Sequence, residues 1–488
     1  MASERAARAG FNGWIIGDDG DPQRARALMD LFALHDIEYR RLGEPVRAGE
    51  LEFAAGQAWV LPARQRQFAL LQAMMEQRTQ FADDTFYDVS AWTLPLAYNL
   101  PFAKVDRLPR TAEMVQASTA LTPREDAVAW VVSWNQLKAP AVLQQLLSNG
   151  ARVRTALKPF SLQSPDGLQE YPRGSIVVLR KIQPESQSAA IYETLRDAAL
   201  AGLKVEATLS NLTALGPDLG SGHFARVDPI RPLIVGGLGV NAYDAGEIWH
   251  LLDHRLGIAA PLVNMNRLGS VKLSDYTHLL MASGDFSSIS DEIRTDIQRW
   301  VLDGGIVLAS ANAATWAENL CFESELAACA EQADQRGSSD VTDPIDEPSQ
   351  AASGARNYAD FVDDEARQTI GGAIVAGLVD QTHPLGFGIA RPDLPLFRRG
   401  TTLLAPAINR YSNPVRYREN PLLAGFMGES RQQEISGVAA VTAERRERGL
   451  VVRFANNPLF RGFWRGTERL YINALYFGQV ITTTELPE

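Results

Sequence analysis

Two stretches decide the fold of this chain: Pro232-Leu233-Ile234-Val235-Gly236-Gly237-Leu238-Gly239 and Gly304-Gly305-Ile306-Val307-Leu308-Ala309-Ser310. Each is a short apolar run beside glycines, which is typical of a buried strand that meets a turn. Between them lie a helical pattern over residues 248–252, the apolar run 277–282 and a second helix that ends near Leu302. This order of strand, helix, strand, helix and strand predicts a doubly wound parallel sheet.

A weak internal repeat precedes this region, because the segment 14–81 can be laid over the segment 130–209. Each copy reads strand, helix, strand, then a glycine before a third strand, and a closing helix. The first helix of each copy begins near a proline, where the missing N–H costs nothing. We expect two tandem α/β lobes whose alternating strands and helices favour parallel sheets. Their second strands are expected at 37–39 and 151–153.

At 488 residues the chain is too long for one hydrophobic core, since single cores stop growing near about 250 to 300 residues. We therefore expect a first α/β lobe at 1–115, a second at 116–228 and a doubly wound α/β domain at 229–488. The segment at about 331–356, rich in Ser, Asp, Gln and Gly, is expected to be a flexible insertion. An aromatic stretch at 86–97 is expected to pack between domains rather than bind a ligand.

The composition excludes several classes of protein. A hydrophobic share of 45% and a charged share of 22% are those of an ordinary globular chain. The net charge of −11, spread along the sequence, repels a phosphate backbone, so no nucleic acid is expected as a partner. The N-terminus lacks the apolar run of a signal peptide, and no segment has the about 18 to 20 apolar residues that span a bilayer. Two cysteines, Cys321 and Cys329, are too few for a disulfide scaffold.

Two groups of side chains could in principle hold a metal ion. Glu247, His250 and His254 share one face of an expected helix, and histidines four residues apart can bind zinc. That face is also the polar side of an amphipathic helix, so we expect it to be solvated. His35 and Glu38 match a His-x-x-Glu zinc spacing, but the histidine ends a helix and no further ligand completes the set. We therefore expect neither a metal nor another cofactor in this chain.

Two turns invite a catalytic or binding interpretation. The run Gly236–Gly239 could cradle a phosphate, but Ala242 stands where the dinucleotide fingerprint has its third glycine, so we expect a plain turn. Ser310 begins a second turn, at the end of a central strand. The domain resembles the flavodoxin-like fold of class I glutamine amidotransferases, which carry a cysteine on such a turn. Here the turn has no cysteine, and Ser310 is an incomplete nucleophile candidate, because His383 is the only late histidine.

Three further stretches carry a family resemblance. They are Phe86-Tyr87-Asp88-Val89-Ser90-Ala91-Trp92-Thr93-Leu94-Pro95, His383-Pro384-Leu385-Gly386-Phe387-Gly388, and Asn457-Pro458-Leu459-Phe460-Arg461-Gly462-Phe463-Trp464 with Asn473-Ala474 beyond. Over nearly the whole chain the sequence resembles the C-terminal region of large bacterial carboxypeptidase A-like proteins. The resemblance implies a zinc peptidase domain before residue 1, which would supply the zinc and the catalytic residues and would be exported to the periplasm or beyond. No catalytic residue of the family can be carried over to a position in this chain.

From these observations we expect a non-catalytic accessory region, without a complete active site, whose partner is a zinc peptidase domain in cis or in trans. Two alternatives stay open. One is a hydrolase or amidase that uses Ser310 or a cysteine as its nucleophile. The other is a module that binds a small ligand or glycan near the carboxyl ends of the parallel strands, where doubly wound sheets place their ligands.

Overall fold

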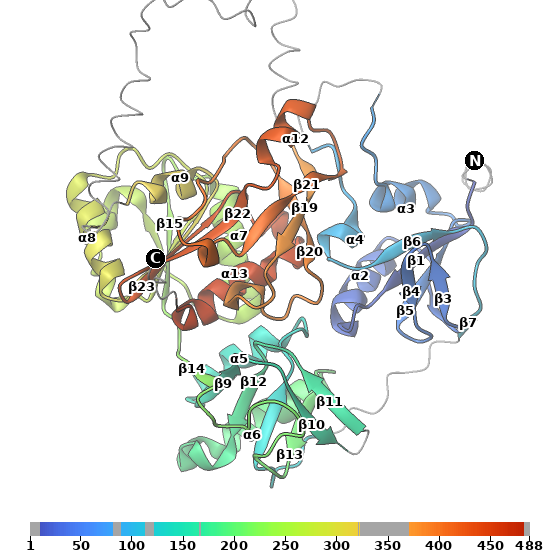
Figure 1. Ribbon diagram of the computed structural model, residues 1–488, viewed down its shortest axis with the longest axis horizontal. Coiled ribbons are helices and arrows are strands. Elements are labelled where there is room, and N and C mark those ends of the chain that lie inside the picture. Colours follow the sequence, from blue (N-terminus) through green and yellow to red (C-terminus); the bar gives the residue numbers. More distant parts are fainter. Residues whose placement is uncertain are drawn as a thin grey trace, which may run out of the picture.

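The computed structural model contains three lobes, each built around its own sheet (Figure 1). The residues that the structure describes are 10–81, 89–112, 122–164, 167–320, 322 and 370–482. In Figure 1 the first lobe lies at the right, the second at the bottom and the third, which is the largest, at the left. Every lobe combines strands with helices, so the predicted α/β class is confirmed.

The first two lobes contain the following elements. The first lobe consists of β1 (Gly13–Gly17), α2 (Pro22–Leu34), β2 (Arg40–Leu42), β3 (Val46–Ala48), β4 (Leu51–Phe53), β5 (Ala58–Pro62), α3 (Phe68–Met75), α4 (Leu94–Ala97), β6 (Phe102–Val105) and β7 (Thr111–Ala112). The second lobe consists of β8 (Ala129–Val132), α5 (Ala139–Ser148), β9 (Val153–Ala156), β10 (Phe160–Ser164), β11 (Gly167–Tyr171), β12 (Ile176–Leu179), α6 (Ser188–Leu200), β13 (Val205–Thr208) and β14 (Phe224–Val227).

The two sheets have the same strand order. It is β6-β1-β5-β2-β7 in the first lobe and β13-β8-β12-β9-β14 in the second, so each strand has a counterpart at the same place in the other sheet. A separate two-stranded hairpin, β3-β4 in one lobe and β10-β11 in the other, lies between the second and third long strands along the chain. The weak sequence repeat is therefore a repeat of topology.

Both of these sheets are antiparallel, which corrects the expectation of parallel sheets. The strands β5 and β12 each lie between the first and second strands of their lobe and run opposite to both. The unexpected hairpins are the reason, because they reverse the chain after the second strand and return the third strand between its two predecessors. The second strands also begin later than expected, at Arg40 and at Val153.

The third lobe has one nine-stranded sheet of order β16-β15-β17-β18-β23-β22-β21-β19-β20. Its elements are β15 (Pro232–Gly236), α7 (Ala242–His250) continued by a π-helical turn (Leu251–Leu256), β16 (Leu262–Asn264), β17 (His278–Met281), α8 (Asp291–Leu302), β18 (Ile306–Ser310), α9 (Asn312–Glu318), β19 (Ala373–Val379), η9 (Pro384–Gly386), β20 (Asp393–Arg398), β21 (Val415–Ala424), α12 (Glu429–Ile435), β22 (Ala439–Arg446), β23 (Gly449–Phe454), η11 (Phe460–Gly462) and α13 (Arg465–Phe477). The first five strands in this order are parallel, as predicted, whereas the other four join the sheet as antiparallel neighbours. The predicted doubly wound sheet is thus extended by an antiparallel half.

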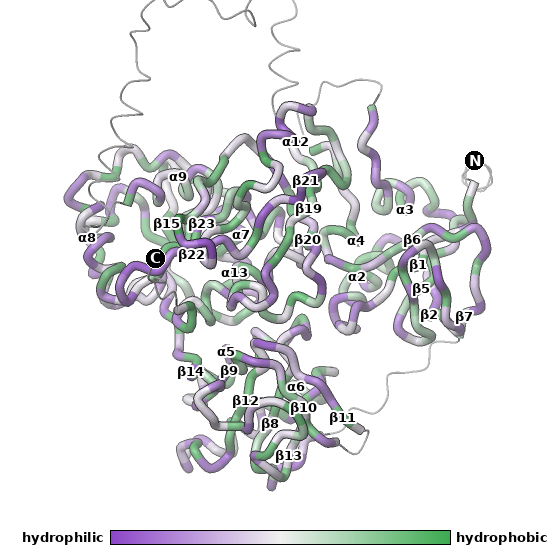
Figure 2. The backbone as a smooth tube through the Cα atoms, viewed as in Figure 1, coloured by the Kyte–Doolittle hydropathy of each residue, from purple (hydrophilic) through white to green (hydrophobic). Residues whose placement is uncertain are grey.

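Burial explains the apolar runs that mark the parallel strands. All residues of β15, β17 and β18 are buried, as expected for strands with helices on both faces of the sheet. Figure 2 shows hydrophobic residues around β15 and hydrophilic residues on the outer helix α8. That helix starts at Ser290, whose hydroxyl accepts a hydrogen bond from the N–H of Ile293, and it buries only one face, which includes Trp300.

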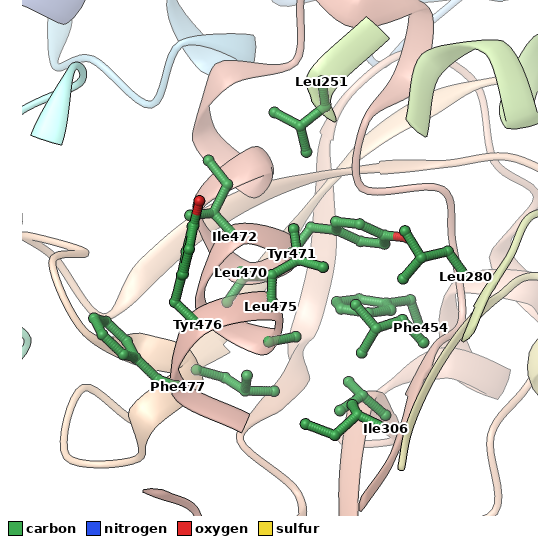
Figure 3. Close-up of a cluster of buried hydrophobic side chains, with 14 of the residues drawn as sticks. Leu251, Leu280, Ile306, Phe454, Leu470, Tyr471, Ile472, Leu475, Tyr476 and Phe477 are labelled. Atoms are coloured by element: carbon green, nitrogen blue, oxygen red, sulfur yellow. The ribbon is translucent and has the colours of Figure 1, made fainter. Parts of the chain in front are cut away.

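Helix α13 lies where the three lobes meet, and all of its residues after Arg465 are buried. On the side of the parallel sheet, Tyr471 packs against Phe454 with a ring separation of 5.6 Å, near Leu280 (Figure 3). On another side, the ring of Phe477 lies 4.8 Å from that of Trp134 in the second lobe. A helix that is covered all round in this way joins lobes instead of facing solvent.

Asn473, on the same helix, is fully buried and makes three hydrogen bonds. Its Oδ1 accepts a hydrogen bond from Nε1 of Trp134 at 2.7 Å, and its Nδ2 donates to the carbonyl oxygens of Leu385 and Phe387, both at 2.8 Å. One amide therefore links the second lobe to the loop around η9. Because each of these polar groups is shielded from water, each depends on this side chain for its partner.

Polar contacts and apolar packing also join the first lobe to the third. Arg391 forms an ion pair with Asp19 at 3.0 Å and donates a hydrogen bond to the carbonyl oxygen of Asn99 at 3.2 Å. Residues 94–97 form the buried helix α4 and share a hydrophobic cluster with Phe397 and Trp464. The described part of the aromatic stretch, residues 89–97, therefore packs between lobes, whereas residues 86–88 lie outside the described ranges.

The expected insertion at about 331–356 and both cysteines, Cys321 and Cys329, also fall outside the described residues. Within the ranges that are described, no helix has the length and apolar character needed to cross a bilayer.

The role of the buried amide predicts a large effect of the substitution Asn473→Ala. Three buried polar groups lose their partner, so we expect the free energy of unfolding to fall by about 2 to 5 kcal/mol. Urea unfolding followed by circular dichroism measures this change. Asn266→Ala, at an exposed asparagine of the same lobe, is the control and should change stability by less than about 0.5 kcal/mol. Equal midpoints for the two variants would contradict this role of Asn473.

Candidate functional site

The turn between β18 and α9 holds a strained residue, and that residue is Ala311. Its φ of 51° and ψ of −123° lie in a region that favours glycine. Its N–H donates to the carbonyl oxygen of Phe454 at 2.9 Å, and its own carbonyl oxygen accepts a hydrogen bond from the N–H of Ala314 at 2.9 Å. The backbone is therefore held on both sides in a sharp strand-to-helix turn, where the amidotransferase-like resemblance places a cysteine. A methyl group has no lone pair and cannot act as a nucleophile there.

Ser310, the nucleophile candidate from the sequence, is the last residue of β18 and is only 3% exposed. All six histidines lie in the described part of the chain, and none of them forms a hydrogen bond to Ser310. His383 instead accepts a hydrogen bond from the N–H of Leu385 at 3.1 Å and so starts the turn η9. Burial lowers the pKa of His383 to about 4, which keeps its ring neutral. The structure therefore does not bring the hydroxyl of Ser310 and the imidazole of His383 together as a nucleophile and its base.

The metal-binding candidates on α7 and the following turn do not share one solvated face, which corrects our expectation. His254 is exposed, its ring is 5.0 Å from that of the half-buried His250, and Glu247 lies under the C-terminal segment. Glu247 Oε1 accepts a hydrogen bond from the N–H of Arg461 at 2.6 Å, and Oε2 accepts one from Nδ2 of Asn457 at 2.5 Å. The reason is tertiary, because a segment more than 200 residues later folds over this helix.

Burial beneath this C-terminal segment changes the pKa of Glu247. Burial raises the pKa of the Glu247 carboxyl to about 7, and the nearby carboxylate of Asp244 adds to the rise. The hydrogen bonds from Asn457 and from the Arg461 N–H oppose that shift without cancelling it. Glu247 therefore titrates near neutral pH as a group that anchors the segment 457–462.

Among the residues that the structure describes, no group of three or more His, Cys, Asp or Glu side chains is placed to hold a metal ion. His35 is the exposed C-terminal cap of α2, and Glu38 is exposed beyond it. The run Gly236–Gly239 forms a turn in which the N–H of Val240 donates to the carbonyl oxygen of Gly237 at 3.1 Å. Asn241 then caps α7 with its own side chain and takes up the helix-start donors that a phosphate would need.

The site that sequence reasoning missed is a cavity of about 1010 Å³ at the junction of the three lobes. Helix α2 and strand β2 line it from the first lobe, the start of α5 from the second, and the turn after α7 together with α13 from the third. Hydrogen bonds close its margin, since Gln23 donates to the carbonyl oxygen of Gly202 at 3.0 Å and accepts from the N–H of Lys138 at 3.1 Å. No local pattern could reveal this cavity, because its walls come from sequence-distant segments.

Four arginines line this junction cavity: Arg26, Arg41, Arg255 and Arg465. The guanidinium of Arg41 lies over the ring of Trp59 at 4.4 Å, because the two residues are directly opposite on β2 and β5. Burial lowers the pKa of Arg41. Across the cavity Arg255 forms an ion pair with Glu468, which also pairs with Arg465 at 3.3 Å. This arrangement presents positive charge to a partly open cavity and favours the binding of an anion.

Comparison with known proteins gives neither a family model nor a curated protein that matches this chain. Among solved structures, a ThuA-like protein from Bacteroides uniformis is 11% identical with a TM-score of 0.29, over 50% of this chain and 89% of that one. The exo-β-1,4-mannosidase Op5Man5 from an Opitutaceae bacterium is 10% identical with a TM-score of 0.23, over 62% of this chain and 40% of that enzyme. A β-galactosidase from Bacillus circulans is 11% identical with a TM-score of 0.24, over 58% of this chain and 34% of that enzyme. Such scores carry no argument about the site.

The raised pKa of Glu247 predicts a pH dependence of stability. The folded state holds this proton more tightly than the unfolded state, so the contribution is present below about pH 4.5 and is lost as pH rises through about 7. We expect Glu247→Gln, the nearest neutral analogue, to raise the unfolding midpoint relative to the natural chain at pH 8 and to change it little at pH 5. Thermal unfolding across this range measures the difference, with the exposed Asp253→Asn as control. Parallel curves for the natural chain and Glu247→Gln would contradict the assignment.

The strained turn predicts opposite effects for two alanine-to-glycine substitutions. Ala311→Gly should leave stability unchanged or raise it by up to about 2 kcal/mol, since strain of about 1 to 3 kcal/mol is relieved against an entropy cost of about 1 kcal/mol. Ala313→Gly, inside α9, should lower stability by about 1 kcal/mol or more. Chemical unfolding of both variants tests this, and a larger loss in Ala311→Gly than in Ala313→Gly would refute strain at Ala311.

Proposed function

We propose that this chain is a non-catalytic accessory region that works with a zinc metallocarboxypeptidase domain and has no complete active site of its own. The observation that carries the proposal is Ala311, the strained residue of the turn on which the amidotransferase-like resemblance implies a cysteine. Strained backbone of this kind is common at active sites, but here the strained residue is an alanine. The turn is therefore consistent with a fold that has kept the shape of an active site and lost its nucleophile.

The positions that carry the family resemblance support a role in architecture. Leu385 and Phe387 belong to one of the resembling stretches, and their carbonyl oxygens are the acceptors of the buried amide of Asn473. Asn457 and Arg461 belong to another, and they hold the carboxylate of Glu247. The first contact links the second lobe to the third, and the second holds the C-terminal segment of the third lobe against α7. Both support the rigidity that a module beside a peptidase domain requires.

The absence of catalysis can be tested on the purified chain. With peptides that have a free C-terminus, we expect no release of C-terminal residues, with or without added zinc, because neither metal ligands nor a paired nucleophile is assembled in the described residues. Amino-acid analysis of the reaction measures the release. Zinc-dependent release above that of a heat-denatured sample would contradict the proposal.

The proposed association with a zinc peptidase domain can be tested separately, in the genome. We expect the coding sequence upstream, in frame or in the adjacent gene, to encode a peptidase domain with a His-x-x-Glu zinc site. An upstream region without any peptidase would overturn the association and would leave the non-catalytic assignment standing.

The alternative of a serine hydrolase is tested by labelling with a fluorophosphonate probe. We expect no labelling, because Ser310 is buried and has no histidine partner. Labelling of the natural chain that disappears in Ser310→Ala would favour the alternative. A cysteine nucleophile stays a prediction, since Cys321 and Cys329 lie outside the described residues. A module that binds a small ligand is the second candidate function, and the junction cavity is the observation that favours it.

A further inference from the structure

The junction cavity carries more positive than negative charge. Five cationic side chains line it against two acidic ones, a local excess of three positive charges in a chain whose net charge is −11. The cationic residues come from all three lobes: Arg26, Arg41, Lys138, Arg255 and Arg465. Because the surrounding chain is acidic, this excess is a feature of the cavity and does not follow from composition.

In the described part of the chain, two of these cations form no ion pair, although the nearby carboxylate of Asp18 attracts the guanidinium of Arg41. Arg26 forms an ion pair with Asp30 at 2.6 Å, and Arg255 and Arg465 share Glu468. Among the described residues, no carboxylate lies within ion-pair distance of Arg41 or Lys138. Arg41 rests on the ring of Trp59, and the ammonium of Lys138 reaches only the carbonyl oxygen of Ala201, at 3.5 Å.

An anion would relieve the resulting repulsion. Like charges that face one partly open cavity from different lobes repel one another, and a guanidinium fork binds carboxylate or phosphate oxygens in pairs. The remaining walls include the apolar side chains of Pro140, Leu256 and Ile472. The volume of about 1010 Å³ lies at the upper end of small-molecule sites, about 300 to 1,000 Å³, so the space exceeds what a single inorganic ion needs.

We propose that the junction cavity is a binding site for an organic anion, whose carboxylate or phosphate group pairs with Arg41 and Lys138 and whose apolar part lies against Leu256 and Ile472. Because the two cations belong to different lobes, the bound anion also fastens the first lobe to the second. The site requires neither the peptidase partner nor the turn at Ala311, so its test is independent of the accessory role proposed above. It rests on the second candidate function, a module that binds a small ligand, and names the chemistry of that ligand.

The test uses the full chain and four probes: inorganic phosphate, citrate, a short apolar peptide with a free C-terminus, and the same peptide with an amidated C-terminus. Isothermal titration measures affinity, and thermal unfolding measures the accompanying stabilisation. We expect at least one probe to bind and to raise the unfolding temperature by about 2 °C or more at saturation. Arg41→Gln and Lys138→Gln should each weaken that binding about tenfold or more. Arg66→Gln, an exposed arginine of the first lobe that does not line the cavity, is the matched control and should bind like the natural chain.

The probes also distinguish the sources of the anionic group. Binding of the acid peptide but not of its amide would assign the site to a chain-end carboxylate, whereas binding of phosphate without citrate would assign it to a phosphate ester. Either result supports the proposal when Arg41→Gln weakens it. Failure of all four probes to bind, or equal loss in Arg66→Gln and Arg41→Gln, would overturn it.

Discussion

The architecture depends on one buried amide, the side chain of Asn473 on α13. Its three hydrogen bonds connect an indole of the second lobe with two carbonyl groups of the third, in a region that water does not reach. Such a group must be satisfied completely, so it fixes the orientation of the parts that it joins. The ion pair of Arg391 with Asp19 adds the first lobe to the same assembly. The relative placement of the lobes, and hence the shape of the space between them, follows from these few contacts.

The parts of the fold that could be predicted are those whose signals are local. The strands β15, β17 and β18 are buried on both faces, so their continuous apolar runs identify them without further knowledge. The repeat of the first two lobes was also visible, because strand, helix and glycine return in the same order. Strand direction was not visible, since it is set by the short hairpins β3-β4 and β10-β11, whose three- and five-residue strands have little pattern of their own.

The candidate site could be predicted only in part, for the same physical reason. The turn at residues 310–313 was recognisable from the glycines and the apolar strand before it, whereas the strain at Ala311 was not predicted. Glu247 was correctly placed on a helix, but the segment that covers it comes from the C-terminal part of the chain. The walls of the junction cavity come from three lobes, and no sequence window contains them together. A cavity of this kind forms only when the folded lobes pack together.

The position of α13 along the chain has a consequence for biosynthesis. The first two lobes end near Val227, whereas the helix that unites them with the third is complete only at Phe477. At about 5 to 20 residues per second, a ribosome needs about 10 to 50 s to cover that interval. During this time the two antiparallel lobes must persist as separate nascent units, with the indole of Trp134 still without its amide acceptor. Until α13 has been synthesised, the two lobes therefore depend on their own small sheets and hairpins to bury their apolar side chains.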